Sequence, residues 1–338
     1  MKRPTGICSA CWAAFAAAFL LGVSQFFCPA EAAVKTVTEP SANSLTRELI
    51  SDPHFRSGFN LIEPRPGRRV VYGELPGSDT GAKPAWDLDQ WSSRFPLSAE
   101  APKKSAPGVM RWSNSGKTVV CGAAGTSEAD VALGVNAFVE YDRRARQSSE
   151  PWVHLLVEQN FTNPPSLAEL SSARLRLAAK LLRSEFHRTA DYSPGRHAAQ
   201  FQMFLMVQNR NRQSRGFGQL VWFGIPLYDD RARFAKEHKA QDFGGTSMFI
   251  FTPGGEVYSE RSAHDREWIH IDKELMPLFR EALETAWKRG FLTESRDLGD
   301  YRITGMNLGW EVPGLFDVEL QVRDLSLKVR SHPAPRRE

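Results

Sequence analysis

The sequence has few cysteines, and most of them lie near its start. Of the four cysteines, Cys8, Cys11 and Cys28 belong to the N-terminal segment, and only Cys121 lies further along the chain. Once that segment is removed, no internal disulfide can form, so a hydrophobic core must stabilise the fold. The roughly 300 residues that remain are enough to bury a large core.

Long apolar runs are also absent, apart from one at the N-terminus. Lys2 and Arg3 precede an apolar run over residues 7–23, and the small-residue sequence AEA follows at residues 30–32. This is the three-part pattern of a cleaved secretory signal. We predict a signal peptide over residues 1–32, a secreted or periplasmic protein, and no membrane span after signal cleavage.

The chain lacks a strong excess of either charge. It has 43 basic and 39 acidic residues, and removal of Lys2, Arg3 and Glu31 with the signal leaves 41 against 38. This balance gives no basic surface for nucleic acid or for a membrane.

Several motifs of catalysis and metal binding are missing. No phosphate-binding glycine loop and no Gly-x-Ser-x-Gly elbow is present. Four close residues match no zinc signature in their spacing: His264, Asp265, His270 and Asp272. Asp229 and Asp230 could bind a structural calcium ion, and no other cofactor is indicated.

Residues 215–231, RGFGQLVWFGIPLYDDR, are the stretch around which the chain is organised. The segment is too apolar for a surface loop, yet Gly224 and Pro226 would weaken a central strand. A strand that bends, or one at a sheet edge, accounts for both features. The acidic pair that follows would then lie where the strand leaves the sheet, a common place for polar groups of a binding site.

Alternating apolar residues predict several further strands. Residues 131–141 and 152–159 alternate or are strongly apolar, and their short connection predicts an antiparallel pair. Residues 174–185 and 199–208 alternate too and are expected to form a hairpin, although a helix over 166–188 is the alternative. The final strand, residues 316–329, changes parity, which predicts a bulge near Arg323 and Asp324.

These patterns predict a mainly β protein, an antiparallel two-sheet, jelly-roll-like β-sandwich. One amphipathic helix is expected near residues 275–289, where Gly290 follows the apolar stripe. We predict a leader or linker over residues 33–51, a single sandwich domain over 52–330 and a tail over 331–338.

Residues 306–314, MNLGWEVPG, are predicted to be a loop with groups that can hold a sugar. Asn307 and Glu311 offer hydrogen bonds, and Trp310 offers a stacking face. Alternatively, Trp310 closes one end of the core and Glu311 pairs with an arginine. The eight tryptophans left after signal removal mildly favour polymer contact, the alternative being that most of them are core.

At these residues the chain resembles the jelly-roll sandwiches of concanavalin-like lectins, glucanases and carbohydrate-binding modules. The resemblance rests on the strands at 199–208 and 316–329, the sequence WFGIPLYDDR and the sequence NLGWE, about a quarter of the chain. It concerns architecture, because the Glu-x-Asp-x-x-Glu arrangement of the glucanases is missing. The resemblance therefore implies glycan binding more strongly than hydrolysis.

Three functions stay open on the sequence alone. The first is binding of a polysaccharide or glycan in a cleft lined by Trp222, Tyr228, Asp229, Arg231, Asn307, Trp310 and Glu311. The second is an enzyme on the same scaffold, either a glycoside hydrolase that uses acids from Asp229, Asp230, Glu311 and Glu158, or a lyase that uses His154, Tyr228, Arg231 and Asn209. The third is a structural envelope protein whose aromatic residues are all core.

Overall fold

The computed structural model describes residues 46–65, 68–79, 81–100, 102–243 and 245–333. The predicted signal peptide, most of the predicted leader and most of the predicted tail lie outside these residues. The leader prediction is wrong for its last residues, because β1 (Thr46–Glu48) pairs with the final strand and Leu49 and Ile50 are buried in the core.

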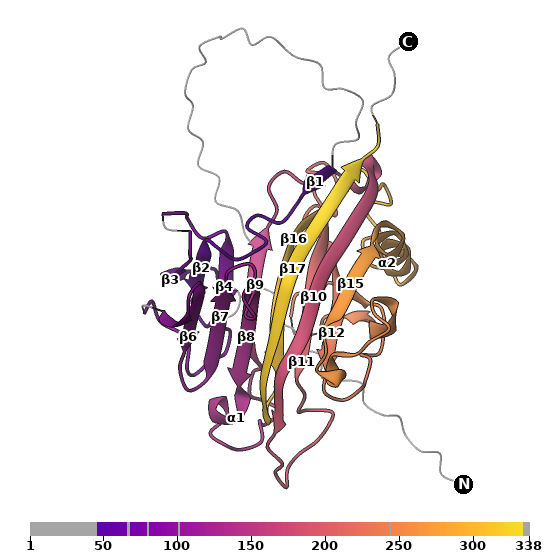
Figure 1. Cartoon of the computed structure of the whole chain (residues 1–338). Helices are drawn as coiled ribbons and strands as arrows, with labels where there is room; N and C mark the ends of the chain where they lie inside the picture. Colours follow the sequence, from indigo (N-terminus) through magenta and orange to yellow (C-terminus); the bar gives the residue numbers. More distant parts are fainter. Residues whose placement is uncertain (1–45, 66–67, 80, 101, 244, 334–338) are drawn as a thin grey trace, which may run out of the picture.

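The described chain forms two sheets packed face to face, which confirms the predicted two-sheet β-sandwich (Figure 1). Most neighbouring strands are antiparallel, and the exceptions among the described strands are the parallel pairs β2–β4 and β12–β14. Sheet A has the order β15 (Ile269–Glu274), β10 (Leu170–Phe186), β17 (Phe316–Ser331), β8 (Asp130–Asn136), β7 (Lys117–Gly122), β6 (Val109–Ser113) and β5 (Lys103–Ala106), with β1 paired to β17. Sheet B has the order β13 (His238–Gln241), β14 (Phe249–Thr252), β12 (Leu220–Asp229), β11 (Gln200–Asn209), β16 (Tyr301–Val312), β9 (Val153–Asn160), β4 (Trp86–Asp89), β2 (Gly58–Ile62) and β3 (Val71–Pro76).

The helices are short and lie outside the two sheets. The amphipathic helix predicted near residues 275–289 is confirmed as α2 (Met276–Lys288), with Pro277 in its first turn, where a missing N–H costs no hydrogen bond. Helix α1 (Ala137–Glu140) follows β8, and the 3₁₀ turns are Leu167–Glu169, Gly255–Val257 and Ala263–Asp265.

The predicted bulge in the last strand is confirmed. Along the pairing of β10 with β17, Arg176 lies opposite Ser326 and Ala178 lies opposite Arg323, so β17 contains one extra residue. Asp324 takes up the bulge with a φ of 58°, and its N–H donates to the carboxylate of Asp130. The apolar residues on both sides of the bulge therefore all face the core.

The strand predicted at 174–185 is confirmed within β10, whereas the one at 131–141 is confirmed only to residue 136, because residues 137–140 form helix α1. Both strands were predicted with the wrong partners. β8 and β9 lie in different sheets, and so do β10 and β11. β8 pairs with β7 and β17, whereas β9 pairs with β16 and β4. Short connections usually join neighbouring strands of one sheet into a hairpin. Here each connection crosses from one sheet to the other, because both strands that it joins have an apolar face that the opposite sheet covers.

The predicted loop over residues 306–314 is largely a strand. β16 continues to Val312 and pairs on both sides, with β11 and with β9. Gly309 permits this close pairing, since a Cβ at that position would lie 2.1 Å from the carbonyl oxygen of Leu155. Gly309, within the segment predicted to be a loop, therefore marks a close approach of two backbones.

β12, at the centre of the organising stretch, bends as predicted. Its pairing with β11 shifts between Pro226 and Tyr228, so Leu227 forms a bulge. Gly224 lies against Thr252 of β14, where a Cβ would come within 2.1 Å of the threonine hydroxyl. The glycine and the proline are thus accommodated in a strand that has partners on both sides.

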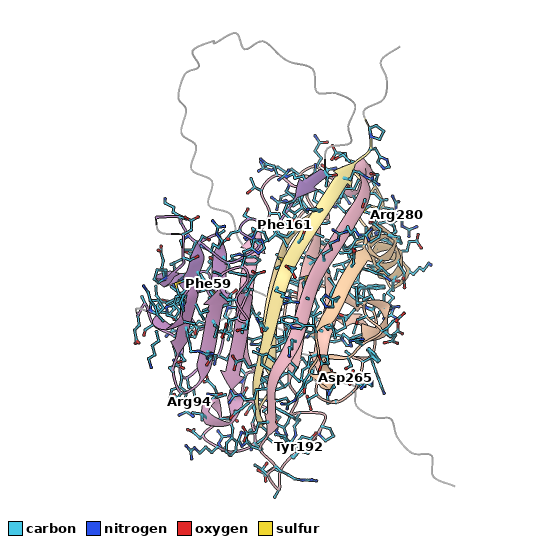
Figure 2. The ribbon with its side chains drawn as sticks, viewed as in Figure 1. Phe59, Arg94, Phe161, Tyr192, Asp265 and Arg280 are labelled. Carbon is cyan, nitrogen blue, oxygen red and sulfur yellow. The ribbon has the colours of Figure 1, made fainter. Side chains whose placement is uncertain are left out.

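A buried ion pair braces the two sheets at one end of the molecule. Lys117 of β7 contacts Glu140 of α1, and both side chains are 0% exposed. The Glu140 carboxylate also accepts hydrogen bonds from the Ser93 hydroxyl and the Arg94 N–H, in the segment that follows β4 of sheet B. Arg94 lies at the end of the molecule where α1 is found (Figures 1 and 2).

Breaking this brace should be costly. We expect Glu140→Ala to lower the free energy of unfolding by about 3–5 kcal/mol, because it leaves the Lys117 ammonium buried without its partner. Urea unfolding followed by tryptophan fluorescence measures the loss. Asp142→Asn, which removes the exposed partner of Arg94, is the control and should cost no more than about 1 kcal/mol. Equal losses in the two variants would refute the bracing role.

Candidate functional site

The outer face of sheet B gathers most of the candidate polar residues. Side chains alternate along each strand, so the register places the outward residues in rows across the sheet. The first row is Asp229, Gln200, Glu311 and His154, and the second is Pro226, Gln202, Gly309, Leu156 and Asp89. The third row includes Gly224, Phe204, Asn307, Glu158, Asp87, Asn60 and Glu74.

Glu311, a predicted site residue, is buried on this face beside Gln202. The Gln202 amide donates to its carboxylate at 3.4 Å. Burial raises the pKa of Glu311 to about 7, and the negative charge of Asp242 adds to the rise, whereas the hydrogen bond from Gln202 opposes it. At neutral pH a large fraction of Glu311 is therefore protonated and can act as an acid.

Asp89 and Glu158 form a pair of carboxyl groups on the same face. Glu158 lies on β9, one strand away from Glu311, and Asp89 lies on β4, two strands away. They are diagonal neighbours in the pairing of β4 with β9. Burial raises the pKa of Glu158 to about 7 and that of Asp89 well above its usual range, and the charge of Asp87 adds to both. Two adjacent buried carboxyl groups cannot both ionise readily, so the pair shares one proton near neutral pH.

Asp87 lies in the same row as Glu158, next to this pair, and hydrogen bonds fix its carboxylate there. The Arg69 guanidinium donates to both Asp87 oxygens, at 2.5 and 2.8 Å, and the Asn60 amide donates to one of them at 2.9 Å. Arg69 therefore neutralises Asp87, and the Asp89–Glu158 pair carries the remaining negative charge.

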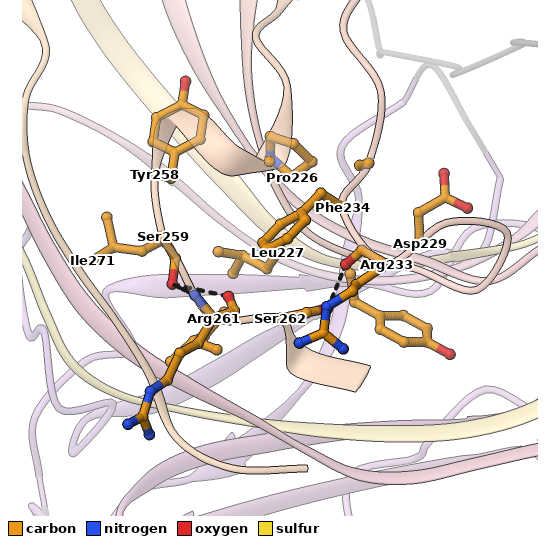
Figure 3. A pocket seen from close by; sticks show the side chains of 14 residues that line it. Pro226, Leu227, Asp229, Arg233, Phe234, Tyr258, Ser259, Arg261, Ser262 and Ile271 are labelled. Carbon is orange, nitrogen blue, oxygen red and sulfur yellow. Dashed lines mark hydrogen bonds between the residues drawn. The ribbon is translucent and has the colours of Figure 1, made fainter. Parts of the chain in front are cut away.

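An open pocket of about 350 Å³ lies on the same face, over β11 and β12. Its floor contains Gln200, Gln202, Pro226 and Thr252, and its wall comes from residues 229–238. This volume and the mixture of amide, hydroxyl and charged groups suit a small sugar unit. Beneath the same chain segment, a second cavity holds only about 20 Å³, room for one water molecule (Figure 3).

Asp229 and Arg231, both predicted site residues, form one wall of the open pocket. The Arg231 guanidinium donates to the two Asp229 oxygens at 2.8 and 2.7 Å, and the Gln200 amide donates at 2.9 Å. Asp230 instead accepts the N–H of Ala199, and burial raises its pKa to about 7. Arg231 binds both Asp229 oxygens, and one Asp230 oxygen accepts a backbone hydrogen bond, an arrangement that does not favour the predicted calcium site.

The predicted aromatic site residues lie mostly in the core. Trp310 is fully buried between the sheets, where its indole N–H donates to the Leu133 carbonyl oxygen. Tyr228 packs against Trp310 and contacts the Ser184 hydroxyl, although its edge reaches the open pocket. Trp222 lies on the outer face in an apolar cluster with Phe204, Leu220 and Ile250. The alternative that the tryptophans are core is thus correct for Trp310.

Among the predicted site residues, the structure brings Tyr228, Asp229 and Arg231 together at the pocket, with Glu311 beside its floor. Asn307 lies one strand from Glu158. Asp89, Gln200 and Gln202 were not predicted from the sequence. The alternation in WDLD, residues 86–89, is a signal that could have found Asp89, because Trp86 and Leu88 face inward and the aspartates outward.

His154, considered for a lyase, is buried next to Glu311. Its Nδ1 atom hydrogen-bonds the Trp152 carbonyl oxygen at 2.9 Å, and burial lowers its pKa to about 4. Asn209, another candidate of that set, lies at the opposite end of β11 and bonds Ser214. His154 and Asn209 therefore do not meet in one site, whereas the other two lyase candidates, Tyr228 and Arg231, both line the open pocket.

No protein-family model matches the chain, and no curated protein matches its sequence. Solved structures with a similar fold include a family 11 xylanase from Neocallimastix patriciarum, at 12% identity and a TM-score of 0.36, covering 69% of this chain and 98% of the xylanase. Endoglucanase Cel12A from Rhodothermus marinus shows 11% identity and a TM-score of 0.36, covering 70% of this chain and 98% of the endoglucanase. The xyloglucanase domain of NopAA, a type three effector from Sinorhizobium fredii, shows 7% identity and a TM-score of 0.36, covering 67% of this chain and 95% of the xyloglucanase domain.

At such low similarity the activities of these enzymes do not transfer to this chain. The resemblance noted from the sequence is likewise one of architecture. Within the residues that the structure describes, no helix is both long enough and apolar enough to span a membrane.

The raised pKa of Glu311 predicts a pH-dependent stability. In the unfolded chain the carboxyl group titrates near 4.5, so folding favours its protonated form and stability falls as pH rises from about 4.5 through 7. Glu311→Gln removes this contribution, while Asp89, Glu158 and Asp230 keep theirs. We expect the stability of the variant relative to the original protein to rise between pH 5 and pH 8, as measured by thermal unfolding.

Glu74→Gln is the control for this measurement. Glu74 lies on the same sheet face but is exposed, so its replacement should leave the pH dependence of stability unchanged. A pH-independent difference between Glu311→Gln and the original protein would contradict the prediction.

Proposed function

We propose that this chain is an exported enzyme that hydrolyses a polysaccharide on the outer face of sheet B. The observation that carries the proposal is a set of three carboxyl groups with raised pKa on that face: Glu311 and Asp89, which are buried, and Glu158, which is partly buried. Acids whose pKa is raised by burial are costly to keep in a folded protein, and such groups are concentrated at catalytic sites.

The positions of these acids suit the two-carboxyl mechanism of glycoside hydrolysis. Glu311 and Asp89 are separated by two strands and two residues in register, which places their Cα atoms about 12 Å apart. Both side chains rise from the same face and can extend toward each other across Leu156. Their carboxyl groups can then approach the separation of about 5–9 Å at which glycosidases place such pairs.

The proton balance assigns a role to each group. Protonated Glu311 donates its proton to the oxygen of the leaving sugar as the glycosidic bond breaks. The Asp89–Glu158 pair, which holds one negative charge, either accepts a proton from the attacking water or attacks the anomeric carbon itself. Water is consumed, and one new reducing end forms for each bond broken.

The pocket over β11 and β12 is the proposed position for a neighbouring sugar unit. Gln200 and Gln202 on its floor offer amide hydrogen bonds to hydroxyl groups, and Gln202 also contacts Glu311. A chain that occupies this pocket and continues across β16 and β9 would place a glycosidic bond between the two sets of acids.

Hydrolysis is tested on soluble neutral polysaccharides and uronic-acid polymers. We expect new reducing ends without absorbance at about 235 nm, because a lyase produces the absorbing unsaturated sugar and a hydrolase does not. Glu311→Gln should lower the rate by about 10²–10⁴-fold, the usual contribution of a general acid. Glu74→Gln, on the same face, should keep the full rate.

Other results have distinct meanings. Binding seen by tryptophan fluorescence, without any product, would replace hydrolysis with glycan binding, which the amide-lined pocket also favours. Product that absorbs at about 235 nm would indicate a lyase. Neither binding nor product with a folded protein would refute the proposal.

A further inference from the structure

A cluster of side chains that could hold a metal ion lies on sheet A, whereas the acids described above lie on sheet B. Glu185 and Asp317 are direct partners in the pairing of β10 with β17, and His187 follows two residues after Glu185. Because Val318 faces the core, Asp317 and its partner face outward. The cluster lies at the end of β10, near Tyr192, which contacts Phe186 (Figure 2).

The three side chains point their donor atoms toward one place. One donor atom from each of Glu185, His187 and Asp317 lies within 4.8 Å of the other two. The His187 Nε2 atom is 2.9 Å from Asp317 Oδ2. An imidazole nitrogen with two carboxylates is a donor set that zinc and similar divalent ions take.

The histidine and the aspartate are held in position by α1 and by the backbone. The Phe138 N–H donates to Asp317 Oδ1 at 3.2 Å, which leaves Oδ2 for the cluster. The His187 ring stacks on the Phe138 ring, with centroids 4.3 Å apart and planes 6° apart. The backbone N–H of His187 donates to the Leu315 carbonyl oxygen. Such supporting contacts orient metal ligands before the metal binds.

The charges of the cluster also favour a cation. Two carboxylates directly opposite each other in a sheet repel, and among the described residues no lysine or arginine forms an ion pair with either Glu185 or Asp317. Arg183, the next outward residue of β10, instead donates to the Asn136 amide oxygen. Glu185 is exposed and can move the short distance needed to close the site.

We propose that Glu185, His187 and Asp317 bind one divalent ion of the zinc class, with water at the remaining position. Calcium is disfavoured because it takes oxygen ligands almost exclusively. The ion would link the end of β10 and the start of β17, and through Phe138 it would fix α1. This site is independent of the proposed hydrolase site, since it lies on the opposite sheet.

Metal binding is tested on the whole protein after treatment with a chelator. We expect one equivalent of Zn²⁺ by calorimetry, a higher Tm with Zn²⁺, and visible d–d absorption with Co²⁺, which reports nitrogen and oxygen coordination. Glu185→Gln and Asp317→Asn should each weaken binding by at least about 10–100-fold, the loss already seen when a supporting contact alone is removed.

Glu319→Gln is the matched control, because Glu319 is the next outward carboxylate on β17 and lies opposite Arg183. It should bind as the original protein does. Absence of binding, or binding that is unchanged in Glu185→Gln, would overturn the proposal. Equal weakening in Glu319→Gln would do the same, since it would indicate a diffuse surface charge.

Discussion

The antiparallel pairing of β10 with β17 is the constraint on which the rest of the structure depends. These strands span 17 and 16 residues, and they lie side by side along the length of the molecule (Figure 1). A strand pair of this length keeps one face in the core only if its twist and side-chain parity are corrected along the way. The bulge at Asp324 makes that correction, and Asp130 of β8 holds it in place.

With sheet A fixed in this way, sheet B can bury one face and still carry polar side chains on the other. Its inward residues, such as Phe201, Phe223 and Trp310, fill the core. Its outward residues include acids that are nevertheless largely buried by their neighbours. Burial dominates the pKa of Glu311 and of the Asp89–Glu158 pair: the nearby Arg69 lowers the pKa of both members of that pair, yet both stay raised. Burying carboxyl groups destabilises the fold, and groups buried at such a cost are typical of functional sites.

Individual strands can be predicted from this sequence better than their partners can. Alternation identified β8, β10, β11 and β17, and the change of parity in β17 even located its bulge, because a period of two is a local property. Pairing is not local. The short connections suggested hairpins, whereas the core between two sheets favoured crossing from one sheet to the other. The NLGWE segment was misassigned for a related reason, since Gly309 serves a close approach to Leu155 that only the neighbouring strand reveals.

The candidate site shows the same limit, and it changes how a sugar would be recognised. Tryptophans suggested stacking platforms, but Trp86, Trp112 and Trp310 are core, and Trp222 is covered within its own cluster. Any glycan on this face must therefore be held mainly by hydrogen bonds from amides and carboxyl groups. Such contacts have little net strength in water and much more when a bound chain excludes it. Specificity would then come from the positions of hydroxyl groups, which Gln200, Gln202 and Glu311 are placed to distinguish.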